Sequence, residues 1–168
     1  MVVEVDDSGW GDLLGGVVIV MRRVDTDEFF SDEIPIELFQ LEFKYKIYLR
    51  KAIEIILNGI DQLKIKNTEP IHICTGYVFT DASETLNELG YRVVEAKIVG
   101  KTQELAEAEF ARSLVRLGVA EYHEVREMRS FNKFLQWVHM DLEDRERYVK
   151  TGWKSWTRLR NRGQNDEE

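Results

Sequence analysis

Apolar residues form short runs in the first part of the chain. Residues 1–5 are rich in valine, and residues 16–23 form a longer run of β-branched side chains. Residues 32–39 alternate apolar and polar side chains, the period of a strand with one buried face. Short connections join these three segments, so the pattern predicts an antiparallel meander, in which Pro35 marks an edge or a strand start.

From residue 41 the apolar spacing becomes that of a helix. One stripe runs through residues 41–63, at Tyr45, Leu49, Ala52, Ile56, Ile60 and Leu63. A second stripe runs through residues 102–117, at Ala106, Phe110, Leu114 and Leu117, and Gly118 follows it. Residues three and four apart lie on the same face of a helix, so both segments are predicted amphipathic helices.

Shorter elements lie between and after these two helices. Residues 71–74 and 91–99 are apolar enough to form buried strands. Residues 82–89 are predicted to form a short helix, with Asp81 as its N-cap and Gly90 as its stop. Residues from about 124 to 160 are predicted to be mostly helical.

The order β-β-β-α-β-α-β-α predicts one mixed α/β sheet: a three-strand antiparallel meander followed by βαβ crossovers, with helices on its faces. We predict a core at residues 1–120. A C-terminal helical extension at residues 121–162 packs on it, and residues 163–168 form a disordered acidic tail.

Composition and net charge argue against some classes of function. A chain of 168 residues with 43% hydrophobic residues can bury a core, and its net charge of −8 argues against general coating of a nucleic-acid backbone. No apolar run is long enough for a membrane span, so we expect no membrane partner and a cytoplasmic protein. Cys74, the single cysteine, is expected to be a buried structural residue. Many charged residues with only two prolines are consistent with a thermophilic source.

The first hairpin, VDDSGWGDLLGGVVIV (residues 5–20), holds three aspartates and a tryptophan in a glycine-rich connection. Together with the segment KIVGKTQELAEAEFARSL (residues 97–114) and the element order, it resembles the ribonuclease H-like superfamily of ribonucleases, Holliday-junction resolvases and transposases. The resemblance covers roughly residues 1–118. It implies hydrolysis of phosphodiesters with Mg²⁺ or Mn²⁺ held by carboxylates.

The resemblance implies an acid at the end of the first strand, which is Asp6 or Asp7. Side chains alternate along a strand, so we expect one of them to face the site and favour Asp6. The resemblance also implies an acid on the predicted helix at residues 102–117. Glu107 lies about 60° from the stripe centre at Phe110, closer than Glu104 or Glu109. Lys101 takes the place of a basic residue near the scissile phosphate.

Two further acids that the resemblance implies are less well matched. The fourth strand of the family ends in Thr-Asp, whereas here Gly76 follows Thr75, and the nearest acid is Asp81. On the first long helix, Glu42 lies about 40° from the stripe centre at Ile56, whereas Glu54 lies about 160° away. Asp81 and Glu42 are therefore the candidate additional metal ligands.

Other interpretations of these residues stay open. Asp6 and Asp7 could satisfy turn amides, and Asp81 could serve only as a helix cap. Trp10 could pack on the core or contact a ligand. The DSGWG segment (residues 7–11) also resembles the phosphate-binding hairpin of actin-like ATPases and sugar kinases.

The segment RYVKTGWKSWTRLRNR (residues 147–162) is basic and rich in aromatic residues. Val149, Trp153 and Trp156 have the spacing of one helical stripe. Such a helix could dock on the core or on a second copy of the chain. Alternatively, its cations and tryptophans could bind phosphates and bases. The candidate nucleic-acid contacts, with Trp10, are Arg147, Lys150, Trp153, Lys154, Trp156 and Arg158.

The sequence therefore predicts a divalent-metal-dependent nuclease, or another nucleic-acid-processing protein, of ribonuclease H-like fold. The principal alternative is a non-catalytic module that binds nucleic acid or protein and keeps a degenerate site. An actin-like domain that binds phosphate or nucleotide is the third possibility. The sequence leaves open whether the protein is an enzyme.

Overall fold

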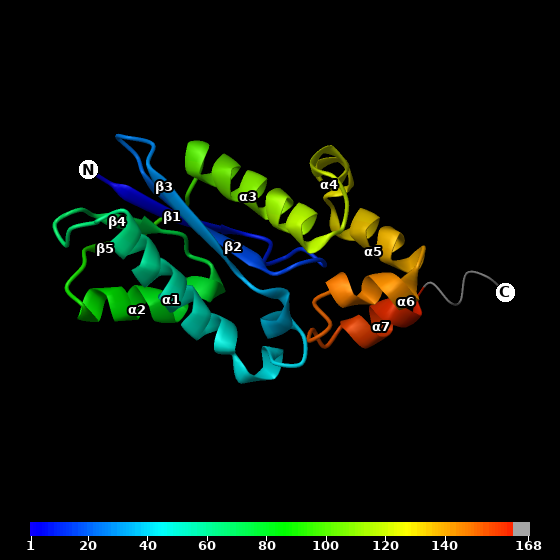
Figure 1. Cartoon of the computed structure of the whole chain (residues 1–168). Coiled ribbons are helices and arrows are strands. Elements are labelled where there is room, and N and C mark those ends of the chain that lie inside the picture. Colours follow the sequence, from blue (N-terminus) through cyan, green and yellow to red (C-terminus); the bar gives the residue numbers. More distant parts are fainter. Residues whose placement is uncertain (163–168) are drawn as a thin grey trace.

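A five-stranded mixed sheet forms the centre of the protein (Figure 1). The computed structural model describes residues 1–162; the predicted acidic tail at 163–168 lies outside them. The strand order is β3-β2-β1-β4-β5. The strands are β1 (Val3–Ser8), β2 (Val17–Arg23), β3 (Phe29–Ile34), β4 (Ile71–Ile73) and β5 (Val93–Glu95). The first three are antiparallel, while β4 pairs parallel with β1 and β5 parallel with β4.

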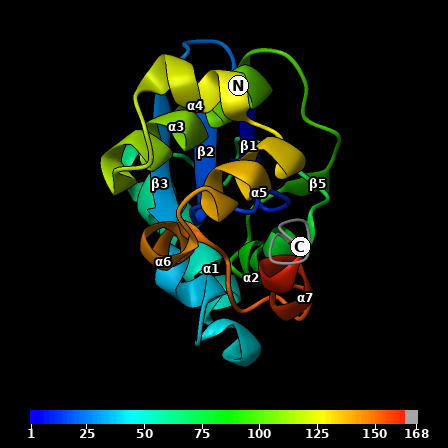
Figure 2. The ribbon, with the colours of Figure 1, turned by 90° about the vertical axis from the view of Figure 1, so that its right-hand side faces the viewer.

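Helices cover both faces of this sheet, as Figures 1 and 2 show. On one face α1 (Ile47–Gln62) packs on Val17, Ile19 and Met21 of β2, and α2 (Thr80–Glu88) lies against α1 and β5 in the same apolar cluster. On the other face α3 (Lys101–Leu117) packs on Val18 and Val20. Every residue of β2 is buried, which explains its continuous apolar run.

This topology confirms the predicted fold class, a ribonuclease H-like mixed α/β sheet. The two parallel pairs are each reached through a crossover that carries a helix, α1 before β4 and α2 before β5. A crossover of this kind brings the ends of β1 and β4 to the same edge of the sheet. Residues that follow these two strands are therefore neighbours.

Several predicted boundaries are corrected by the structure. The third strand is β3, and Pro35 ends it by removing an amide donor; the 3₁₀ helix η1 (Ile36–Phe39) follows. The first long helix starts at Ile47, because Lys46 has a left-handed backbone with φ 56°, and the 3₁₀ helix η2 (Phe43–Tyr45) precedes it. The fifth strand is only three residues long.

The C-terminal part is a set of short helices, and residues 147–162 do not form the continuous helix that their apolar spacing predicted. The short helices are α4 (Tyr122–Met128), α5 (Phe131–His139), α6 (Leu142–Arg145), η4 (Glu146–Tyr148) and α7 (Trp156–Asn161). Their apolar residues share one buried cluster with α3 and β2. In Figure 1, α5, α6 and α7 gather beyond one end of the sheet. Val149 pairs there with Leu14 in an isolated bridge.

No helix among residues 1–162 combines the length and apolarity needed to cross a membrane.

Candidate active site

A pocket of about 400 Å³ opens where β1 and β4 end. Asp6 and Asp7 of β1, Cys74 after β4 and Glu107 of α3 contribute to its wall, together with Arg129 from the C-terminal part. The structure thus brings Asp6, Asp7 and Glu107, the acids predicted first, to one pocket. Cys74 and Arg129 are among the pocket residues that the sequence did not predict for the site.

Three side chains form the centre of this pocket. One ligand atom from each of Asp6, Asp7 and Cys74 lies within 4.8 Å of the other two. The Cys74 amide donates to the carbonyl of Val5 over 3.0 Å, so the residue continues the β4 ladder beside Asp6. Cys74 is half-buried at the pocket rather than buried in the core, which corrects the structural role expected from its apolar neighbours.

Both aspartates reach the pocket although they point to opposite faces of β1. Asp6 pairs with Val20, whose side chain lies under α3, so its carboxylate faces α3. Asp7 points to the other face, where a Cβ added at Gly76 would lie 3.5 Å from its Oδ1. The expectation that only one aspartate faces the site was wrong, because the pocket wraps around the end of the strand.

Burial and mutual repulsion make these carboxyl groups reluctant to ionise. The pKa of Asp7 is raised to about 6, first by burial and then by the charge of Asp6. The pKa of Asp6 is also raised, mainly by burial, with Glu107 contributing through its charge. Among residues 1–162, Asp6, Asp7 and Glu107 form no ion pair. The pocket therefore holds negative charge that a bound cation would compensate.

Glu107 is the acid of α3 that lines the pocket. Glu104 is exposed, and Glu109 pairs with Arg112 and accepts a hydrogen bond from Ser31. Glu107 lies outside the trio of atoms within 4.8 Å, so it would meet a ligand from another side. Of these three glutamates, the one that the helical spacing from Phe110 favoured is the one that lines the pocket.

Trp10 lies on the pocket wall and also against the core. Its ring is 5.4 Å from that of Tyr48, 5.8 Å from that of Tyr77 and 6.0 Å from that of Phe39, centroid to centroid. These contacts fix the indole at the pocket wall. The two interpretations of Trp10, core packing and ligand contact, are therefore compatible.

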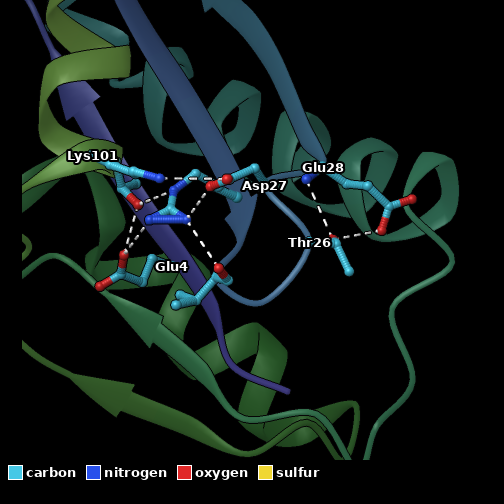
Figure 3. A network of polar contacts seen from close by, with 8 residues as sticks. Glu4, Thr26, Asp27, Glu28 and Lys101 are labelled. Atoms are coloured by element: carbon cyan, nitrogen blue, oxygen red, sulfur yellow. Dashed lines mark hydrogen bonds and ion pairs between the residues drawn. The ribbon is translucent and has the colours of Figure 1, made fainter.

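Lys101 lies away from the pocket, contrary to the prediction. Its Nζ donates to Asp27 over 3.5 Å, in the network of Figure 3. In that network Arg22 bridges Asp27 and Thr102, and Thr102 donates to Glu4. Lys101 precedes Glu107 by nearly two helical turns, or about 9 Å along the axis, which places it at the other end of β1.

Glu42 and Asp81 are not brought to the site. Both are exposed, and neither lines the pocket. Glu42 precedes η2, because the long helix begins six residues later than predicted, at Ile47. Asp81 is not the N-cap of α2 either: that position is Phe79, and Asp81 lies in the first turn.

Two residues of the predicted nucleic-acid surface are buried instead. Lys150 is completely buried, and its Nζ donates to the carbonyl oxygens of Asp12 (2.7 Å) and Leu14 (2.9 Å). Trp156 is 4% exposed, and its Nε1 donates to Glu146. Neither side chain can contact a base or a phosphate, because both are buried and their polar atoms bind other residues of this chain.

The other predicted contacts in this segment differ in exposure. Arg147 is exposed and pairs with Asp144, and Lys154 and Arg158 are exposed. Trp153 is partly buried against the apolar cluster under α3. Contacts of these four residues with nucleic acid, or of α7 with a second copy of the chain, remain predictions.

The buried Lys150 predicts a distinctive pH dependence of stability. Burial lowers its pKa from 10.5 to about 7. Between these values the unfolded chain binds a proton that the folded chain does not, so the free energy of unfolding should rise with pH. Urea denaturation at about pH 7 and about pH 9 should show this rise in the wild type but not in Lys150→Met. The exposed-lysine control Lys154→Met should behave like the wild type. Equal pH dependence in all three proteins would contradict the prediction.

Comparison with known proteins adds a distant structural likeness. The sequence matches no known protein family and no curated protein. Among solved structures, the crystal structure of the catalytic core domain of BIV integrase is similar to 84% of this chain and 84% of its own. The sequence identity is 14% and the TM-score 0.38. That likeness is too distant to carry an argument. The topology by itself defines a mixed α/β domain of the ribonuclease H-like fold class, with an acidic pocket at the end of β1.

Proposed function

We propose that this protein is a divalent-metal-dependent nuclease whose active site is the acidic pocket. The observation that carries the proposal is the convergence of Asp6, Asp7 and Glu107, without cationic partners among residues 1–162, on one pocket at the end of β1. Three unpaired carboxylates suit a cation bound by oxygen. A divalent ion held there would activate water and stabilise the leaving oxygen of a phosphodiester.

The donor set supports Mn²⁺ more than Mg²⁺. The aspartate oxygens suit either ion, whereas the Cys74 sulfur is a soft ligand that Mg²⁺ does not favour. In this proposal Asp6 and Asp7 bind the ion directly, with the thiol beside them, and Glu107 completes the site from α3.

The surroundings of the pocket support nucleic acid as the substrate. Trp10 presents a fixed ring at the pocket, and stacking on a base needs no particular sequence. Lys97 lines the same pocket, and the ammonium of Lys46 lies 6.0 Å from the ring of Tyr77, which packs on Trp10. These exposed cations could bind the phosphates that flank a cleaved bond.

A cleavage assay tests the proposal. The purified chain, with Mn²⁺, Mg²⁺ or excess chelator, is incubated with labelled single-stranded DNA, duplex DNA, duplex RNA and an RNA–DNA hybrid. We expect cleavage of at least one substrate, faster with Mn²⁺ than with Mg²⁺ and absent with chelator. Cleavage that persists in chelator, or in the double variant Asp6→Asn with Asp7→Asn, would contradict the proposal.

One observation favours a second candidate, a non-catalytic binding module. Gly76 follows Thr75 after β4, where the resemblance implies a carboxylate, and the β4 residue beside Asp6 is Cys74. A site degenerate in this way would bind nucleic acid without hydrolysing it. Binding that chelators do not affect, with no cleavage under any of the metal conditions, would support this candidate over the nuclease.

A further inference from the structure

Arg129 is the residue that the C-terminal part contributes to the acidic pocket. It follows α4 and precedes α5, and its side chain is 21% exposed. It is 121 residues from Ser8 in sequence, yet it contacts that residue through a hydrogen bond. The fold therefore places a second cation, besides Lys97, on a wall rich in carboxylates.

Three contacts fix the guanidinium. Nε and Nη2 donate to the two oxygens of Asp12 over 3.3 and 3.1 Å, a two-point contact, and Nη2 also donates to Ser8 Oγ over 2.7 Å. The guanidinium carbon lies 4.6 Å from the centre of the Phe110 ring. An arginine held in this way loses little side-chain entropy when it binds a ligand.

These contacts leave donors free. Among residues 1–162, the Nη1 group of Arg129 makes no hydrogen bond, whereas Nε and Nη2 are both engaged. A guanidinium offers five N–H groups in a planar fork that matches the oxygens of a phosphate. Arg129 also lines the same pocket as Asp6, Asp7 and Glu107, so a ligand there would meet both the acids and this donor.

We propose that Arg129 binds a non-bridging oxygen of the nucleic-acid phosphodiester in the pocket. This rests on the proposed function only in taking nucleic acid as the ligand, since the contact needs no bound metal. Carboxylates alone would repel the phosphate backbone, and the fixed guanidinium offsets that repulsion at the cleavage site. The pairing with Asp12 orients the guanidinium, and the free Nη1 group meets the ligand.

The test measures binding separately from cleavage. Fluorescence anisotropy with the four labelled nucleic acids of the cleavage assay, in chelator, gives the Kd of the full chain as a function of salt. Arg129→Gln should weaken binding about ten-fold, the effect of losing one charged hydrogen bond. It should also reduce the slope of log K against log salt by about one, because one phosphate contact is lost.

Two variants separate binding from structure. Arg126→Gln removes an exposed arginine of α4 three residues away, and should leave both the Kd and the salt slope close to wild type. Arg129→Lys keeps the charge but not the fork, so it should retain the salt slope with a Kd weakened several-fold. If Arg129→Gln does not fold, this lysine variant carries the test.

The outcomes distinguish this proposal from the nuclease. Unchanged Kd and salt slope in Arg129→Gln and Arg129→Lys, or no binding of any probe by the wild type, would overturn the role of Arg129. Binding that depends on Arg129, without metal-dependent cleavage, would leave Arg129 as a phosphate-binding residue and reject the nuclease. Metal-dependent cleavage, together with binding that does not depend on Arg129, would support the nuclease and reject the role of Arg129.

Discussion

Replacing Asp6 with asparagine is expected to slow metal-dependent cleavage by about 100- to 1,000-fold. Asparagine keeps the shape of the side chain but removes the charge that would hold a cation beside Asp7 and Cys74. Metal catalysis supplies several kcal/mol of transition-state stabilisation, and each 1.36 kcal/mol corresponds to ten-fold in rate. Single-turnover cleavage with Mn²⁺ measures the loss.

The same variant should be at least as stable as the wild type without metal. The pKa of Asp6 is raised, so its ionised form at neutral pH is a cost to the fold that asparagine removes. For such an acid the cost appears as the pH rises above the unfolded pKa and is complete once the pH exceeds the folded pKa. An inactive but stable Asp6→Asn variant would separate catalysis from folding.

Glu4→Gln is the matched control for Asp6→Asn. Glu4 lies on the same strand and the same face, two residues earlier, and accepts a hydrogen bond from Thr102 outside the pocket. Its loss of charge should leave cleavage within a few-fold of wild type. Equal loss in both variants would indicate a general charge effect, and wild-type rates in Asp6→Asn would remove Asp6 from the mechanism.

Replacing Phe110 with alanine is expected to cost about 3–5 kcal/mol of unfolding free energy, the usual range for a buried phenylalanine. Its ring is fully buried between α3 and the first hairpin. A Cβ added at Gly9 would collide with this ring, so the hairpin and the ring are in close contact. The ring also supports the guanidinium of Arg129.

Urea denaturation measures the cost, with Phe131→Ala as the control. Phe131 begins α5 and is 36% exposed, so its removal should cost less than about 1 kcal/mol. Phe110→Ala should also weaken nucleic-acid binding at temperatures where it is folded, because Arg129 loses its support. Similar stability losses for the two variants would contradict this assignment of the core.

The spacing of apolar residues within single segments predicted much of the fold. The stripe through Phe110 gives both the buried face of α3 and the position of Glu107, because a helix has a fixed angle per residue. The apolar run of β2 and the short run before Cys74 likewise predicted buried strands. The order of these elements, with short connections, was enough to predict a mixed sheet.

The wrong predictions concern contacts between residues far apart in the chain, or the residue at which a helix begins. Lys101 has the chain position of a site residue, but the start of α3 lies beside Asp27, at the other end of β1. Lys150 and Trp156 look like exposed binding residues, but the C-terminal segment folds back on the first hairpin. The backbone of Lys46 is left-handed, so α1 begins after it and does not include Glu42.

By itself the sequence determined most of the elements of the sheet, their order and the fold class, because these depend on periodicity within single segments. Asp6, Asp7 and Glu107 were candidate acids because the resemblance implies acids at these places. Only the tertiary structure decided that Cys74 stands beside Asp6 and that Arg129 reaches the pocket. Those neighbours come from parallel pairing of β1 with β4 and from docking of the C-terminal helices. Such contacts join residues far apart in the chain, and no local pattern encodes their distance.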